Sequence, residues 1–188
     1  MGEFWPVADV LAYLTGSWRV ERSVRDRASG AEGRFTGTTV FSPFSPPSSI
    51  SQPSSISQPS SISPDSSISP DSSISPSSSL GGRGGLGDGL LHHESGVFTW
   101  QGTSRPAERT LWFLPGPRAA TAAVRFSDGR PFHDLDLTTG RHVADHPCAA
   151  DLYRGEFTVF EADRWRTVWR VGGPAKDLLL TTEYTRSR

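Results

Sequence analysis

The chain has 188 residues, with 19 basic side chains, 20 acidic side chains and a formal net charge of −1. This near balance excludes a general electrostatic affinity for nucleic acid or for an anionic membrane surface. The length is sufficient for one domain with a hydrophobic core.

The single cysteine and the lack of a secretory signal or an apolar membrane-spanning run predict a cytoplasmic location. Cys148 is the single cysteine, so no internal disulfide can form, and a reducing cytoplasm is the expected setting. Residues Met1–Pro6 carry no secretory signal, and no apolar run approaches the ~18 residues that span a bilayer. Lys176 is the only lysine, and the richness in arginine, alanine and glycine indicates a GC-rich bacterial genome. We therefore expect a cytoplasmic bacterial protein with no nucleic-acid or membrane partner.

A short helix is predicted at the N-terminal end of the fold. Val7, Val10, Leu11 and Leu14 share one face at helical spacing, which is typical of a small cap packed on the end of a barrel. The tripeptide Gly16–Trp18 follows at once and opens the first strand-like run. A Gly-x-Trp opening before a meander of strands is typical of lipocalin-like up-and-down barrels.

The segment 43–87 is predicted to be a disordered insert. Ser-Ser-Ile-Ser occurs five times at a period of six, with Pro, Gln or Asp in the spacers. One isoleucine in six residues buries too little area to offset the entropy of ordering the chain, and Pro blocks both helix and sheet ladder. A hexapeptide β-helix is the alternative. The expected organisation is one barrel domain over 1–188, interrupted by this insert at a hairpin tip.

The rest of the chain is predicted to form about ten strands, separated by turns rich in Gly, Pro, Asp and Ser. The fold class is therefore all-β, a single antiparallel up-and-down barrel of the calycin-like kind. The expected strands are Trp18–Val24, Arg34–Phe41, Gly89–Glu94, Val97–Gln101, Ala107–Leu114, Ala120–Phe126, Pro131–Leu137, Gly155–Phe160, Arg164–Val171 and Asp177–Tyr184.

A structural pair is expected at the closed end of the barrel. In such barrels the tryptophan of the Gly-x-Trp motif closes the floor, and an arginine from the last strand packs across it. Trp18 and Arg186 hold these positions. A guanidinium over an indole face contributes about 1 kcal/mol when partly desolvated. Contact of Trp18 with a ligand is the alternative.

Candidate binding residues gather between Pro131 and Gly155. Alternation places Asp134 and Asp136 on one face of their strand and His133 on the other. If the two acids face solvent, the imidazole points into the lumen, either as a satisfied core histidine or as the polar anchor of a ligand. Tyr153 is a second anchor from the same stretch.

Further lumenal residues are expected from three other strands. His92 and His93 are adjacent and face opposite sides, and His93 is expected to point inward because Glu94 shares the face of His92. Trp100 and Trp169 are expected as aromatic walls, which would suit a flat apolar ligand. Such aromatic residues also fill small barrels without any ligand.

Metal and covalent chemistry have weaker support, so neither a metal nor a cofactor is expected. His142, His146 and Cys148 are of metal-ligating types, but their spacing matches no strong zinc pattern, and one histidine is weak evidence for haem. Cys148, His146 and Asp151 could form a thiol site, although no family motif surrounds them. An acid–base site of His133, Asp151 and Tyr153 is the stronger enzymatic alternative.

Outside the insert, the chain resembles the uncharacterised bacterial proteins of domain-of-unknown-function family 6314. The family carries no established activity, so the resemblance implies the fold and no function. The likeness rests on the segments Leu14–Arg22, Gly89–Gly96, Phe132–Asp136, His146–Gly155, Trp169–Lys176 and Tyr184–Arg186.

The function predicted from the sequence is binding of a small, largely apolar molecule with a polar end inside the barrel. His93, His133 and Tyr153 would be the polar anchors. One alternative is a small enzyme that uses the same lumen, with His133 as general acid or base. The other is a non-catalytic interaction domain whose barrel is filled by its own side chains.

Overall fold

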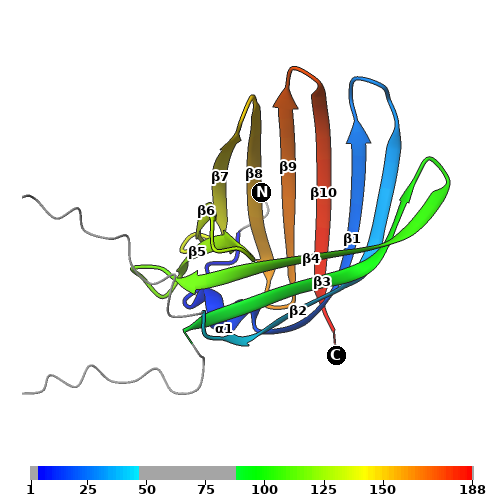
Figure 1. Cartoon of the computed structure of the whole chain (residues 1–188). Helices are drawn as coiled ribbons and strands as arrows, with labels where there is room; N and C mark the ends of the chain where they lie inside the picture. Colours follow the sequence, from blue (N-terminus) through cyan, green and yellow to red (C-terminus); the bar gives the residue numbers. More distant parts are fainter. Residues whose placement is uncertain (1–3, 47–87, 188) are drawn as a thin grey trace, which may run out of the picture. The chain divides into compact units, whose positions relative to one another are not determined.

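The computed structural model describes residues 4–46 and 88–187 as one unit of ten strands and one short helix (Figure 1). The repeat, on which the prediction of a disordered insert falls, lies outside these residues. In chain order the elements are α1 (Val10–Leu14), β1 (Gly16–Asp26), β2 (Glu32–Phe44), β3 (Gly89–Trp100), β4 (Thr103–Pro115), β5 (Thr121–Phe126), β6 (Pro131–Asp136), β7 (Arg141–Cys148), β8 (Asp151–Glu161), β9 (Arg164–Gly173) and β10 (Lys176–Arg186).

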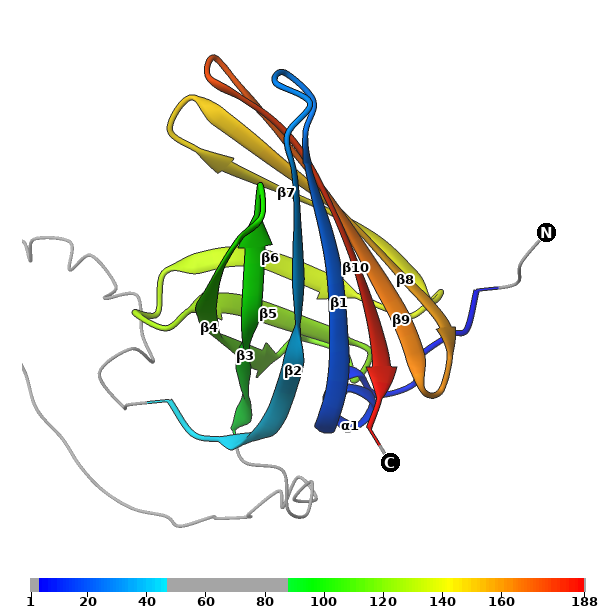
Figure 2. The ribbon, with the colours of Figure 1, turned by 90° about the vertical axis from the view of Figure 1, so that its right-hand side faces the viewer.

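All ten strands belong to one antiparallel sheet. Its order is β6-β5-β4-β3-β2-β1-β10-β9-β8-β7, so each strand pairs with its chain neighbour and β1 pairs with β10. Figure 2 shows the sheet wrapped around an interior. The predicted all-β class and the up-and-down barrel are therefore confirmed, with the first and last strands joined by a register that places Trp18 opposite Arg186.

The barrel is nearly closed, and the remaining gap lies between β6 and β7. These two strands end the sheet order, and no ladder joins them within residues 4–46 and 88–187. We call this line the seam. Across it, the Nε2 of His142 donates a hydrogen bond of 3.1 Å to the carbonyl oxygen of Asp134. The Phe132 ring also meets the His146 ring edge-on, with centroids 4.9 Å apart.

Strand alternation assigns the interior side chains. On β1, Trp18 and Val20 are fully buried, and Arg22 points to the same side. On β9, Trp165 and Thr167 are buried, whereas Arg170 is exposed on the outer face. On this strand the aromatic side chains therefore face inward and Arg170 faces outward.

The N-terminal segment closes one end of the barrel. Asp9 caps α1 by accepting hydrogen bonds from the amides of Leu11 and Ala12, both at 3.0 Å. The apolar face of the helix is buried, and Val10 donates a main-chain hydrogen bond to Ala119. The expected cap is therefore present. Across the described ranges, no helix has the length and apolarity that crossing a membrane requires.

The start of the insert was placed too early. The expected boundary was residue 43, but the ladder of β2 with β3 continues to Phe44, which lies opposite Gly89. The Phe44 ring also packs on Trp112 of β4, with centroids 5.1 Å apart. These contacts extend β2 beyond Phe41, the expected end of the strand, and through Pro43, the expected start of the insert.

Candidate functional site

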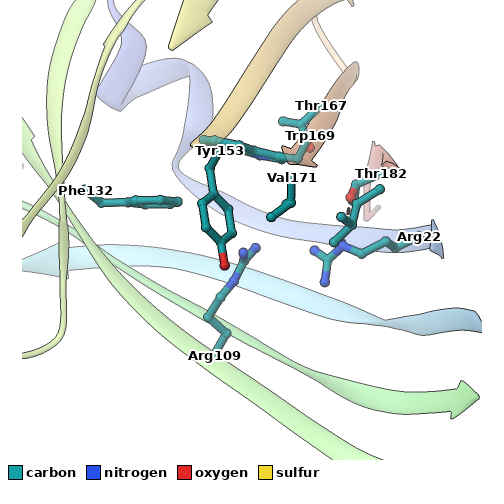
Figure 3. Close-up of a pocket in the computed structure, with 9 residues that line it drawn as sticks. Arg22, Arg109, Phe132, Tyr153, Thr167, Trp169, Val171 and Thr182 are labelled. Carbon is teal, nitrogen blue, oxygen red and sulfur yellow. Dashed lines mark hydrogen bonds between the residues drawn. The ribbon is translucent and has the colours of Figure 1, made fainter. Parts of the chain in front are cut away.

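Two adjoining cavities occupy the lumen. The smaller one, of about 130 Å³, has an apolar wall from Phe132, Tyr153, Trp169, Val171 and Leu180 (Figure 3). We call it the aromatic cavity. The second, of about 290 Å³, includes Val24, Phe35, Phe98 and Ala107 in its wall. Arg22, Arg109 and Leu180 line both, so the cavities are neighbouring parts of one interior space.

A stack of two rings forms the main wall of the aromatic cavity. Phe132 and Trp169 lie nearly parallel, with an interplanar angle of 12° and centroids 5.3 Å apart. Phe132 occupies an irregularity of β6, where the pairing with β5 shifts register between Val124 and Arg125. A bulge redirects a side chain in this way, and here the ring lines the cavity.

The indole of Trp169 depends on the residue opposite it. Trp169 pairs with Gly155 of β8, and the ring lies over that glycine. A Cβ at this position would be 2.7 Å from two ring atoms. Glycine therefore provides the space in which the indole lies as a flat wall.

Charged residues also line the lumen. Arg22 of β1 donates two hydrogen bonds to Glu94 of β3, from Nη1 to Oε1 at 2.9 Å and from Nη2 to Oε2 at 2.7 Å. Its Nε donates a third, of 2.8 Å, to Thr182 Oγ1. Arg109 of β4 lies farther off, with its Nη2 3.5 Å from Glu94 Oε2. We call these residues the Arg–Glu–Arg cluster: Arg22, Glu94 and Arg109.

Glu94 keeps its negative charge although it is buried. The Glu94 side chain is only 3% exposed. Burial alone would raise the pKa of its carboxyl group, but the charge of Arg109 and the hydrogen bonds and charge of Arg22 outweigh burial and lower it. The lumen therefore contains one carboxylate between two guanidinium groups.

The expected orientation of His93 is wrong. His93 is exposed on the outer face of β3, where its Nδ1 lies 3.4 Å from Thr110 Oγ1. His92 and Glu94 are the inward residues, each 2% exposed. The prediction assumed that an acid faces solvent. Arg22 supplies the counter-charge inside, which turns Glu94 inward and His92 with it.

His92 lies in an apolar environment. Its ring contacts Phe41 and Phe113, with centroids 4.8 Å and 5.9 Å away, and its buried Nδ1 has no hydrogen-bond partner in the described part of the chain. Burial, followed by the charge of Arg109, lowers its pKa to about 3. The imidazole is therefore neutral at physiological pH.

His133 points inward but lies behind the wall of the aromatic cavity. Its ring packs among Phe132, Phe157 and Trp169, with centroids 4.7 to 5.5 Å away. Its Nδ1 donates a hydrogen bond of 2.8 Å to the carbonyl oxygen of Asp134. Burial is the main cause that lowers the pKa of His133 to about 4.

The remaining candidates occupy different places. Tyr153 lines the aromatic cavity. Trp100, at the end of β3, stacks on Phe98 with centroids 6.1 Å apart, but it lies two residues after Phe98 and does not line the second cavity. The three expected polar anchors therefore do not converge: Tyr153 lines the cavity, His133 supports its wall, and His93 lies outside. Sequence reasoning missed the Arg–Glu–Arg cluster.

The Trp18–Arg186 pair is in contact at the closed end. The Arg186 guanidinium lies 4.1 Å from the Trp18 ring centroid. It also donates hydrogen bonds to the carbonyl oxygens of Thr15 and Tyr13, at 2.9 Å and 2.5 Å. The indole Nε1 of Trp18 donates to Leu14 at 2.8 Å. These contacts fasten α1 and its flanks to the floor of the barrel.

The arrangement of the described residues gives little support to a metal site or to a thiol site. Among the described residues, no group of three or more His, Cys, Asp or Glu side chains is placed to hold a metal ion. Cys148 is exposed. Asp151, which was considered as its orienting acid, accepts a hydrogen bond of 2.6 Å from Lys176.

Fold and site together define a lipocalin-like barrel with a partly charged lumen. A family model matches residues 14–186, and the chain belongs to that family of unknown function, DUF6314. The resemblance noted from the sequence is thereby confirmed. No match to the chain is found among curated proteins.

Two solved structures are similar to this chain in fold. One is the S-type phycobiliprotein lyase CPES from Guillardia theta, with 8% identity, a TM-score of 0.57 and coverage of 98% of this chain and 94% of the lyase. The other is a protein of unknown function from the DUF3598 family of Nostoc punctiforme, with 10% identity and a TM-score of 0.52. This chain is 98% covered in that match and spans 51% of the Nostoc protein.

Proposed function

We propose that the barrel binds a small, flat, largely apolar molecule with a polar end in its lumen. The observation that carries the proposal is the stacked pair of Phe132 and Trp169, which presents a planar wall to a cavity instead of filling it. Aromatic side chains in a concave apolar site are typical of small-molecule binding. Val171 and Leu180 add apolar surface to the same cavity.

The polar end of the molecule would meet the opposite side of the aromatic cavity. There Tyr153 and Arg109 point toward each other, and Arg22 lies beside Thr182 (Figure 3). Tyr153 therefore remains a proposed anchor. His133 is proposed to act indirectly, by holding Phe132 and Trp169 in place.

Two observations favour binding over the alternatives. A barrel filled by its own side chains would leave no space, whereas two cavities of about 130 and 290 Å³ adjoin here. An acid–base enzyme would need His133 to reach a substrate, but its Nδ1 is engaged by the main chain and its ring lies behind Phe132. The likeness to a phycobiliprotein lyase supports the barrel fold and leaves the ligand open.

The direct test uses N-phenyl-1-naphthylamine, an uncharged, flat, apolar probe that becomes fluorescent in apolar surroundings. The full chain should bind it with saturation. Trp169→Leu should weaken binding about tenfold, since an aromatic contact contributes about 0.5–1.5 kcal/mol beyond its area.

The matched control is Trp5→Leu, because Trp5 is 49% exposed and outside both cavity linings. This variant should bind the probe like the parent protein. Absence of saturable binding in the parent, or equal losses in the two variants, would refute the proposal.

A further inference from the structure

We propose that the polar end of the ligand is an anion, a carboxylate or sulfonate, held by Arg109 in the aromatic cavity. The inference rests on the proposed binding function and deepens it. Its first support is charge: the described lining of this cavity contains two guanidinium groups, those of Arg22 and Arg109, and no carboxylate.

Each of the three guanidinium nitrogens of Arg22 already donates a hydrogen bond. Its Nη1 and Nη2 bind the two oxygens of Glu94, and its Nε binds Thr182. A bidentate guanidinium–carboxylate pair of this kind is geometrically fixed. Arg22 therefore neutralises Glu94 and supports the site as a positioning residue.

Of the two arginines in this lining, Arg109 has no dedicated partner among the described residues. Its closest acidic atom, Glu94 Oε2, is 3.5 Å away and already accepts a hydrogen bond of 2.7 Å from Arg22. Within residues 4–46 and 88–187 the Arg109 guanidinium makes no hydrogen bond, and its side chain is 41% exposed. One carboxylate is thus shared by two guanidinium groups, which leaves the lumenal cluster with an excess of one positive charge.

The neighbouring groups do not cancel this charge. Burial keeps His92 neutral, with its pKa lowered to about 3. Glu108 is the other acid in the second cavity's lining, but it is exposed and alternation directs it away from the face of Arg109. An anion in the aromatic cavity would therefore meet a partly desolvated cation, where charge attraction is stronger than in water.

Hydroxyl groups complete the proposed anion site. Thr182 Oγ1 accepts from Arg22 Nε, and among the described residues its own O–H has no acceptor, so it can donate to a ligand. Tyr153 contributes a phenol that points toward Arg109 across the cavity (Figure 3). Donors of these types, next to a guanidinium and a stacked aromatic wall, fit a flat apolar molecule that ends in an anionic group.

The test compares two probes that differ by one charged group. They are N-phenyl-1-naphthylamine and 1-anilinonaphthalene-8-sulfonate, which carries the added sulfonate. In Arg109→Gln the affinity for the sulfonate should fall about tenfold or more, while the affinity for the uncharged probe stays within about twofold. Arg109→Lys should recover part of the loss, because it restores the charge without the fork of donors.

The control for the arginine change is Arg170→Gln, on the outer face of β9. It should leave both affinities unchanged. Equal losses for the two probes in Arg109→Gln would overturn the anion site and leave the binding function intact. Failure of the parent protein to bind the uncharged probe would instead overturn the proposed function.

A second measurement needs no variant and covers the case in which Arg109→Gln does not fold. Bound N-phenyl-1-naphthylamine is displaced from the parent protein with 2-naphthoate and with 2-naphthamide, which have nearly the same shape and differ in charge. The carboxylate should compete at least about tenfold better. Equal competition would contradict an anion site.

Discussion

Gly155 shapes the aromatic cavity because glycine has no side chain. The Trp169 indole lies over it, and a Cβ would come within 2.7 Å of the ring. A contact this short between a Cβ and the ring would force one of the two groups to move, and the Trp169 indole is the group that can do so. The planar wall of the aromatic cavity therefore depends on a glycine that does not itself line the cavity.

Replacing Gly155 with Ala should displace the indole into the aromatic cavity. We expect the affinity for N-phenyl-1-naphthylamine to fall about tenfold, and overpacking to lower the free energy of unfolding by about 1–3 kcal/mol. Probe titration and thermal unfolding would measure the two effects. Gly172→Ala on the adjacent β9 is the control, because a Cβ there meets nothing within 4 Å. Similar loss of affinity in both variants would contradict this role of Gly155.

His92 should make the fold sensitive to acid. Its pKa is about 3 in the folded protein, against 6.5 for an unperturbed histidine. Between these values the unfolded chain binds more protons, so the free energy of unfolding decreases as pH falls below 6.5. His92→Phe should remove about 1–2 kcal/mol of this decrease between pH 6.5 and pH 5, as measured by urea unfolding. His133, whose pKa is lowered to about 4, would account for part of the dependence that remains.

The adjacent histidine provides the control for that experiment. His93→Phe changes the same residue type on the outer face of the same strand. It should leave the dependence of unfolding free energy on pH unchanged. A parallel change in both variants would show that the acid sensitivity does not come from the buried imidazole.

At the residue scale, the sequence predicted the aromatic wall of the cavity better than it predicted the charged residues of the lumen. Alternation placed Trp169 and His133 on the inward faces of their strands, where they are found. Alternation also puts Arg22 on the same face as Trp18, but the pattern alone does not link that arginine to Glu94. The two are far apart in the chain, and their pairing depends on where β1 and β3 meet across the barrel. An acid was therefore taken as an outward residue.

At the scale of elements, the expected number of strands was right although two of the assignments were not. The runs Gly89–Glu94 and Val97–Gln101 are one strand, β3, because Gly96 lies directly opposite Gly37 and the ladder passes between them. The strand β7 was missed. Its sequence is polar and contains a proline, and as an edge strand it has only one ladder partner, so neither apolar alternation nor strand propensity marks it.

The junction of α1, β1 and β10 provides the prediction at this scale. Trp18→Ala should lower the free energy of unfolding by about 3 kcal/mol or more, as large aromatic truncations do. Arg186→Ala should also destabilise, because it removes hydrogen bonds to Tyr13 and Thr15. A double-mutant cycle should give a coupling of about 0.5–1 kcal/mol or more. Additive losses would mean that the ring contact contributes nothing.

At the scale of the whole molecule, the repeat should be dispensable for the barrel. Phe44 and Gly89 lie opposite each other at the ends of β2 and β3, so a short turn can join these strands. Replacing residues 47–87 with a four-residue turn should leave the melting temperature unchanged or raise it. Shortening the connection about tenfold lowers the closure cost by about 2 kcal/mol.

A longer deletion tests where the barrel ends. Removing residues 43–87 also removes Pro43 and Phe44, which pair with β3, and Phe44 packs on Trp112. This variant should melt below the first one. A loss of several degrees in the shorter deletion would show that the repeat stabilises the fold.

The seam gives the barrel a line along which it can widen, which a fully hydrogen-bonded barrel lacks. In the described part of the chain, separating β6 from β7 breaks no ladder of the sheet. It breaks the hydrogen bond from His142 to Asp134 and ring contacts such as that of Phe132 with His146. The free-energy cost of widening the barrel therefore arises mainly from the contacts along the seam. Phe132 lies on that line and also stacks on Trp169 in the cavity. The Phe132 ring therefore both shapes the aromatic cavity and helps to hold the seam together. The width of the barrel and the shape of its binding space cannot change independently.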